Sequence, residues 1–218
     1  MNQFLRVPLI LALKEFRDGL RDRWVAAATI LLAILALSLM ALGSLPTGST
    51  GVDALAVSVV SLSSLTIYLI PLIALLLSYD AIVGETENGT MLLLLAYPVS
   101  RWQVVAGKYL GHLAILAFAT IVGYGSAGLT LVFTDSQIAA ESWVAFSGMV
   151  GSSILLGATF VGIGYLISVL VSERSMAAGV AVAVWLFFVL LYDLGVLGLL
   201  VADKGQQIGG EFVQYLLM

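Results

Sequence analysis

The chain has 218 residues, of which 61% are hydrophobic and only 10% are charged, and its formal net charge at pH 7 is -4. Soluble domains are about 45–50% apolar and about 25% charged, so this composition excludes a soluble domain and predicts an integral membrane protein. The acidic balance offers no basic face for nucleic acid, and the lack of cysteine excludes disulfides and thiolate metal sites built from this chain alone.

Residues 1–23 predict an amphipathic helix that lies in the plane of the membrane. One face collects apolar residues at steps of three and four along the chain, namely Leu5, Leu9, Leu13, Phe16 and Leu20. The other face carries charged residues, among them Lys14, Arg17 and Arg21. We expect the apolar face to lie at the acyl boundary and the basic residues to meet anionic headgroups. The helix is either a simple anchor or a contact for a partner.

A transmembrane domain over residues 24–218 follows, with five apolar stretches long enough to cross a hydrocarbon layer of ~30 Å as helices. They lie at approximately 24–44, 55–79, 104–133, 143–171 and 175–201. Backbone groups in lipid must be hydrogen-bonded within their own segment, so all five stretches predict helices. The predicted fold class is therefore an all-α membrane bundle.

The basic residues predict which side of the membrane each loop occupies. Of the nine lysines and arginines, all but Lys204 fall on one side of the five-span arrangement: Arg6, Lys14, Arg17, Arg21, Arg23, Arg101, Lys108 and Arg174. An excess of basic residues marks the cytoplasmic side. We therefore expect the N-terminus and residues 80–101 to be cytoplasmic.

Residues 80–101, between the second and third spans, combine acidic residues with a leucine run. Asp80, Glu85 and Glu87 come first and are expected to be exposed charges, because they lie where the second span leaves the membrane. The apolar run at residues 91–96 is too short to span and too apolar for a solvated loop. It predicts a short helix parallel to the membrane, whose apolar face packs under the protein's own helices or docks a cytoplasmic partner.

Local capping signals bound this short helix. Thr90 precedes the leucine run and is expected to be its N-cap, while Pro98 biases Tyr97 out of helix and so ends it. Ser100 with Gln103 three residues later forms a capping-box pattern that opens the third span.

Polar residues inside the spans need a separate explanation. A charged Asp193 in the fifth span would cost about 2.5–3.5 kcal/mol on insertion scales, so it is either a structural carboxylate at a subunit contact or part of a translocation path. His112 is interpreted as a packed or interfacial histidine, and Gly107 with Gly111 permits close helix approach. An intramembrane serine hydrolase is rejected, because Ser126 lacks the spacing of a nucleophile elbow.

Taken together, the cytoplasmic motifs resemble the signature of the ABC-2 family of transporter permeases. YDAIVGETENGTMLLLLAYPVSR (79–101) followed by GKYLG (107–111) gives an acidic stretch, Gly-Thr, a leucine run, Pro-x-Ser-Arg and Gly-Lys in the family's order. Three further stretches are similar to the branch that serves nitrous oxide reductase maturation: KEFRDGLRDRW (14–24), PLIALLLSYDAIVGE (71–85) and FFVLLYDLGVLGLLV (187–201).

The resemblance implies a permease of the bacterial inner membrane that forms a dimer with a second copy of itself. It implies as partners two copies of a cytoplasmic ATPase, which binds ATP and Mg, and a periplasmic copper-handling maturation protein. It assigns docking of the ATPase to one set of residues: Asp80, Glu85, Glu87, Gly89, Thr90, Leu93, Leu94, Pro98 and Arg101. Family members have six spans, so we also expect a sixth helix that these 218 residues do not contain.

The residues themselves agree with this division of labour. Gly107-Lys108 is followed by Tyr109 and does not form a phosphate-binding P-loop, so ATP is expected to be hydrolysed by another subunit. One histidine and no cysteine leave little to bind copper, so no metal site is expected. Two other functions remain open: an ABC-2 exporter of lipid, drug or polysaccharide, and a membrane scaffold without a coupled ATPase.

Overall fold

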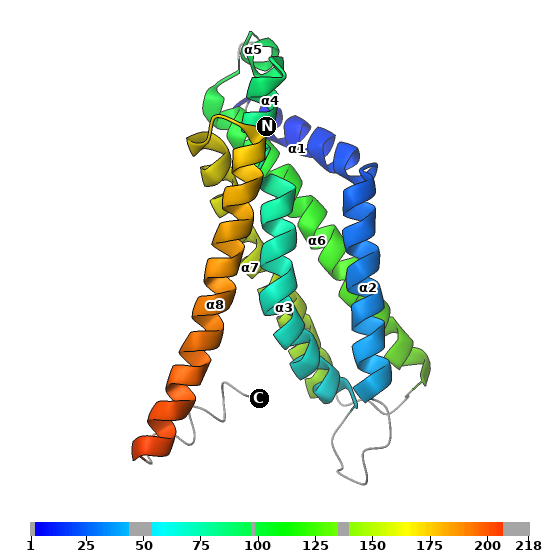
Figure 1. The fold of residues 1–218 in the computed structure, drawn as a ribbon. Coiled ribbons are helices and arrows are strands. Elements are labelled where there is room, and N and C mark those ends of the chain that lie inside the picture. Colours follow the sequence, from blue (N-terminus) through cyan, green and yellow to red (C-terminus); the bar gives the residue numbers. More distant parts are fainter. Residues whose placement is uncertain (1–2, 44–53, 97–98, 135–139, 207–218) are drawn as a thin grey trace.

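The computed structural model describes residues 3–43, 54–96, 99–134 and 140–206, and every element in these ranges is a helix (Figure 1). The helices are α1 (Gln3–Leu20), α2 (Arg23–Gly43), α3 (Ala54–Ser78), α4 (Val83–Glu87), α5 (Thr90–Leu95), α6 (Arg101–Thr134), α7 (Ala140–Leu170) and α8 (Arg174–Gln206). Within these ranges α2, α3, α6, α7 and α8 are long and apolar enough to cross a membrane. The predicted all-α fold with five spans is confirmed, although α6 and α7 begin slightly earlier than expected.

The centre of the bundle is the contact between α3 and α7, with α6 against both. Glycines on α7 let the helices approach closely. A Cβ at Gly164 would overlap Ser78 Oγ, and one at Gly157 would overlap a methyl carbon of Leu116 on α6. Small residues are the usual means of bringing helix backbones together in lipid, where no hydrophobic effect drives association.

A buried hydroxyl cluster ties the same three helices together within the membrane. Thr66 Oγ1 on α3 lies 2.9 Å from the Tyr124 hydroxyl on α6 and 3.4 Å from Ser153 Oγ on α7. Buried polar groups in a membrane span have no water to bind, so they must hydrogen-bond to each other. These hydrogen bonds favour the arrangement in which α3, α6 and α7 contact one another.

Helix α1 lies across the end of the bundle and packs on α6 (Figure 1). The predicted glycine pair makes this contact. A Cβ at Gly107 would lie 2.6 Å from Leu11 Cβ, and one at Gly111 would lie 2.5 Å from Glu15 Cβ. The residues of α1 that meet the two glycines thus lie between the two faces that the sequence indicated.

The predicted leucine face of α1 lies beside this contact. Leu9, Leu13 and Leu20 are exposed, while Phe16 packs its ring edge-on to Phe118 of α6, with centroids 6.1 Å apart. The Leu5 side chain falls outside the described part of the chain. Arg17 and Arg21 are exposed on the polar side, so the amphipathic pattern is preserved, and its placement in the membrane plane stays a prediction.

Helix α8 is attached to the bundle along α3 and has few buried residues in its apolar stretch. Trp185 Nε1 donates a hydrogen bond of 2.9 Å to the Tyr68 carbonyl of α3. Near the same level the Tyr68 hydroxyl donates to Asp193 Oδ1 over 2.8 Å. The Asp193 carboxylate of the fifth span therefore has a hydrogen-bond partner on another helix, although the Asp193 side chain is exposed on the surface of the bundle.

Candidate functional site

The described residues of the predicted docking segment lie at the end of the bundle where α1 and the starts of α6 and α8 also lie (Figure 1). Helix α4 was not expected from the sequence. It is held by Ser168, a buried residue near the end of α7, whose Oγ accepts the backbone N–H groups of Ile82 at 2.9 Å and Val83 at 3.0 Å. The first N–H groups of a helix have no partner within it, so this serine replaces a local cap.

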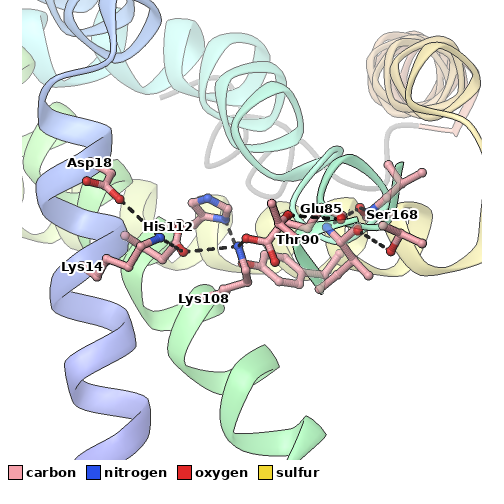
Figure 2. A network of polar contacts seen from close by, with 12 residues as sticks. Lys14, Asp18, Glu85, Thr90, Lys108, His112 and Ser168 are labelled. Carbon is pink, nitrogen blue, oxygen red and sulfur yellow. Dashed lines mark hydrogen bonds and ion pairs between the residues drawn. The ribbon is translucent and has the colours of Figure 1, made fainter. Parts of the chain in front are cut away.

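Lys108 of α6 is the centre of a charged network that joins three helices (Figure 2). Its Nζ lies 2.7 Å from Glu85 Oε1 of α4 and 3.3 Å from Glu15 Oε1 of α1, and its side chain is only 4% exposed. The expectation that Glu85 is a freely exposed charge is wrong, because the buried ammonium group draws the carboxylate inward. Among the described residues Glu85 Oε2 is buried without a hydrogen-bond partner.

On α1 the network extends towards solvent (Figure 2). Lys14 Nζ lies 3.3 Å from both Glu15 Oε1 and Asp18 Oδ2. Burial alone would raise the pKa of Glu15, but the positive charges of Lys108 and Lys14 outweigh it and hold the pKa below its ordinary value. Burial likewise opposes the charge of Lys14, and the carboxylates of Glu15 and Asp18 raise its pKa in spite of it. Both groups are therefore ionised at neutral pH.

A second set of contacts attaches the segment to α8. Arg174 Nη2 lies 2.7 Å from Asp80 Oδ2, and the Arg174 backbone N–H donates to Glu87 Oε1 over 2.7 Å. Glu87 thus places a negative charge at the N-terminus of α8, where the helix dipole favours it. Asp80 is half-buried, contrary to the expected exposed charge, whereas Glu87 is exposed.

The link between α4 and α5 depends on Gly89, whose φ of 71° is in the left-handed region. Glycine adopts this conformation without the steric cost of a Cβ, so it ends α4 and serves as the N-cap of α5. The prediction that Thr90 caps the short helix is wrong. Its hydroxyl instead donates to the Glu85 carbonyl over 3.2 Å.

Helix α5 presents an exposed apolar tip made of Leu92 and Leu93. These side chains are 76% and 70% exposed, whereas Leu94 is half-buried. The sequence analysis had chosen Leu93 and Leu94 as the docking leucines. The structure exposes Leu93, but its exposed neighbour is Leu92 and not Leu94. The tip of α5 therefore carries two adjacent, exposed apolar side chains.

The chain after α5 returns to the bundle through the predicted capping box. The Ser100 N–H donates to Gln103 Oε1 over 3.0 Å, and the Gln103 N–H donates to Ser100 Oγ over 3.3 Å, which confirms that prediction. Arg101, the first residue of α6, is exposed. Pro98 lies outside the described residues.

Two other polar residues inside the spans have partners. His112 is buried, and its Nδ1 lies 2.8 Å from the Tyr165 hydroxyl of α7, as expected for a packed histidine. Asp193 is on α8 about 28 Å along the helix from Arg174, apart from the Lys108 network. In the part of the chain that the structure describes, no three histidine, aspartate or glutamate residues come together to hold a metal.

The sequence did not assign a role to Lys108, Glu15, Ser168 or Arg174, although they hold the segment in place. One signal was available for Lys108. A lysine two turns inside an apolar helix needs a buried anionic partner, and acidic residues lie both before that helix and in the N-terminal helix. Which of these carboxylates meets the lysine depends on the helix packing.

Comparison with known proteins adds the family. Residues 9–217 match the ABC-2 family transporter protein. The chain is 47% identical over 196 residues to a Pseudomonas aeruginosa protein named probable ABC transporter permease protein NosY, an alignment covering 89% of this chain and 71% of that protein. It is 44% identical over 220 residues to a Stutzerimonas stutzeri protein of the same name, covering 100% of this chain and 78% of that protein.

Proposed function

Because the chain belongs to the ABC-2 family of transporter permeases, as a membrane subunit and not the ATPase, we propose that it couples ATP hydrolysis by its partner ATPase to maturation of nitrous oxide reductase. The two relatives named NosY support this choice, together with the motifs that the chain shares with the maturation branch. The proposed partners are a second copy of the chain, two ATPase copies that bind ATP and Mg, and a periplasmic copper-handling protein.

The observation that carries the proposal is the contrast between the tip of the docking segment and its base. Leu92 and Leu93 at the tip are exposed apolar side chains, which suit a groove on the ATPase. Apolar anchors in a desolvated pocket commonly supply most of the affinity of an interface, and charges at its rim supply less. Glu87, an exposed residue at the end of α4 within the segment, suits such a rim.

The base of the segment is attached to four other helices, and this is what allows a displacement to be passed on. Ser168 holds α4 to α7, Lys108 joins α4 to α6 and α1, and Arg174 joins it to α8. When the ATPase closes on ATP, a shift of α5 is transmitted through these contacts to the spans. Packed helices respond to such shifts by moving as rigid elements.

In the proposed orientation the docking end of the bundle is cytoplasmic, in the inner membrane of a bacterium. The basic residues support this, because α1 and the starts of α2, α6 and α8 gather them at that end (Figure 1). A cysteine introduced by Asn88→Cys should not react with an impermeant thiol reagent in intact cells, and should react after permeabilisation. Labelling of intact cells would reverse the orientation and remove the basis for ATPase docking.

Complementation tests the proposed function. In a bacterium that lacks its own permease of this system, the chain with its ATPase should restore active, copper-loaded nitrous oxide reductase. The Leu92→Ser/Leu93→Ser variant should fail at matched membrane expression, and the apolar control Leu92→Met/Leu93→Met should succeed. A chain that binds and stimulates the ATPase but leaves the reductase inactive would instead support an exporter of another substrate.

A further inference from the structure

A cavity of about 330 Å³ lies where α2 and α8 begin and α3 ends. Its lining is mixed in character. The charged residues are Asp22, Asp80 and Arg174, the aromatic residues are Trp24 and Tyr79, and the apolar residues are Leu76 and Leu77. None of the functions described above uses Asp22, Trp24 or the two leucines.

The chain order places this cavity at a membrane boundary. Arg23 and Arg174 are the first residues of two membrane spans, and tryptophan and tyrosine are enriched at the level of the headgroups. Leu76 and Leu77 lie in the last turn of α3, deeper along the helix than Tyr79 and Asp80. The cavity therefore has an apolar part towards the hydrocarbon and a charged part towards the headgroups.

The charged part offers one cation and one anion to a ligand. Arg174 uses Nη2 to bind Asp80 Oδ2 at 2.7 Å, and its half-exposed guanidinium carries further N–H donors suited to a phosphate. Asp22 Oδ1 accepts the Trp24 backbone N–H at 2.8 Å. Asp22 is exposed, so its other oxygen, Oδ2, can accept from a ligand.

We propose that this cavity binds a phospholipid whose headgroup carries a primary ammonium. The ammonium donates to Asp22, the phosphate accepts from Arg174, and the acyl chains lie against Leu76 and Leu77. A trimethylammonium headgroup has no N–H to donate to the carboxylate. A headgroup that carries only negative charge is repelled by the carboxylates of Asp22 and Asp80 and attracted by Arg174 alone, so it binds more weakly.

Native mass spectrometry of the full chain in detergent tests this site with three lipids of identical acyl chains: phosphatidylethanolamine, phosphatidylcholine and phosphatidylglycerol. The first should bind about fivefold more tightly than the other two, as expected for one charge-assisted hydrogen bond at a partly exposed site. Asp22→Asn should abolish this preference, because the amide keeps the oxygen that caps α2 but loses the charge. Glu173→Gln, an exposed change beside Arg174, should preserve it.

Two results would overturn the proposal. One is equal binding of the three lipids, or a preference for the amine lipid that Asp22→Asn leaves unchanged. The other is full displacement of the lipid by free phosphoethanolamine, which would assign the site to a soluble ligand. None of these measurements requires the ATPase, so they are independent of the proposed function.

Discussion

Replacing Lys108 by methionine removes the buried cation that faces Glu85 and Glu15 while keeping a side chain of similar length. The three side chains are 4%, 21% and 13% exposed, respectively. Leaving a buried charge without its partner typically costs about 3–5 kcal/mol. Glu85 can reach solvent and Glu15 keeps Lys14 at 3.3 Å, so we expect a smaller loss of about 2–3 kcal/mol.

Thermal unfolding of the purified subunit in detergent measures this loss. For a chain of this size a loss of about 2–3 kcal/mol corresponds to a fall in Tm of roughly 5–10 °C. The neutral combination Lys108→Met/Glu85→Gln/Glu15→Gln should recover most of the lost stability, because no uncompensated charge remains. Lys14→Met, which removes an exposed lysine of the same network, should change the free energy of unfolding by less than about 1 kcal/mol.

The same variants separate stability from coupling. With the ATPase present, Lys108→Met should retain ATPase binding through α5 but uncouple ATP turnover from reductase maturation, because α4 is no longer tied to α1 and α6. The reasoning is refuted if Lys108→Met lowers Tm no more than Lys14→Met does. It is equally refuted if the neutral combination is as unstable as Lys108→Met alone.

Further predictions concern α1 and the fifth span. Gly107→Ala places a Cβ 2.6 Å from Leu11 Cβ and should cost about 1–3 kcal/mol in thermal unfolding, whereas Gly148→Ala, with nothing within 4 Å, should not destabilise; equal effects would contradict the α1–α6 contact. Burial raises the pKa of Glu15, but the neighbouring lysines lower it by more, so the folded-state pKa lies below the ordinary value of 4.5. The contribution of Glu15 to the free energy of unfolding is therefore fully present above pH 4.5 and is lost as the pH falls through the folded-state pKa. The Tm difference between wild type and Glu15→Gln should therefore vanish in acid, and a difference that grows on acidification would reverse the assigned sign. Asp193→Asn should leave the complex assembled but impair reductase maturation, and full reductase activity would make Asp193 a structural residue.

Most of the fold could be predicted because the signals for it are local. A stretch of about 20 apolar residues must be helical in lipid whatever its neighbours are, and the Ser100–Gln103 capping box involves residues three apart. The leucine run predicted α5 because it too is a local signal, contained within six residues. The outward direction of Leu92 was missed, because it depends on how α4 and Gly89 orient the short helix.

The interior of the site could not be predicted, because its contacts join residues far apart in the chain. Ser168 caps α4 from α7, and Lys108 selects Glu85 and Glu15 from several nearby acidic residues. Periodicity assigns a residue to a face of its own helix but does not say which helix covers that face. The three acidic residues of the segment were therefore expected to be exposed, whereas the structure partly buries two of them, Asp80 and Glu85, in ion pairs.

Pull-down of the ATPase tests the docking function of α5 most directly. Wild type, Leu92→Ser/Leu93→Ser and the control Leu92→Met/Leu93→Met are compared at matched membrane expression, with ATP turnover measured on the same preparations. The serine variant should lose most of the captured ATPase and the stimulated turnover, and the methionine control should keep both, because apolar anchors supply the affinity. If the serine variant captures and stimulates the ATPase as wild type does, α5 does not dock it.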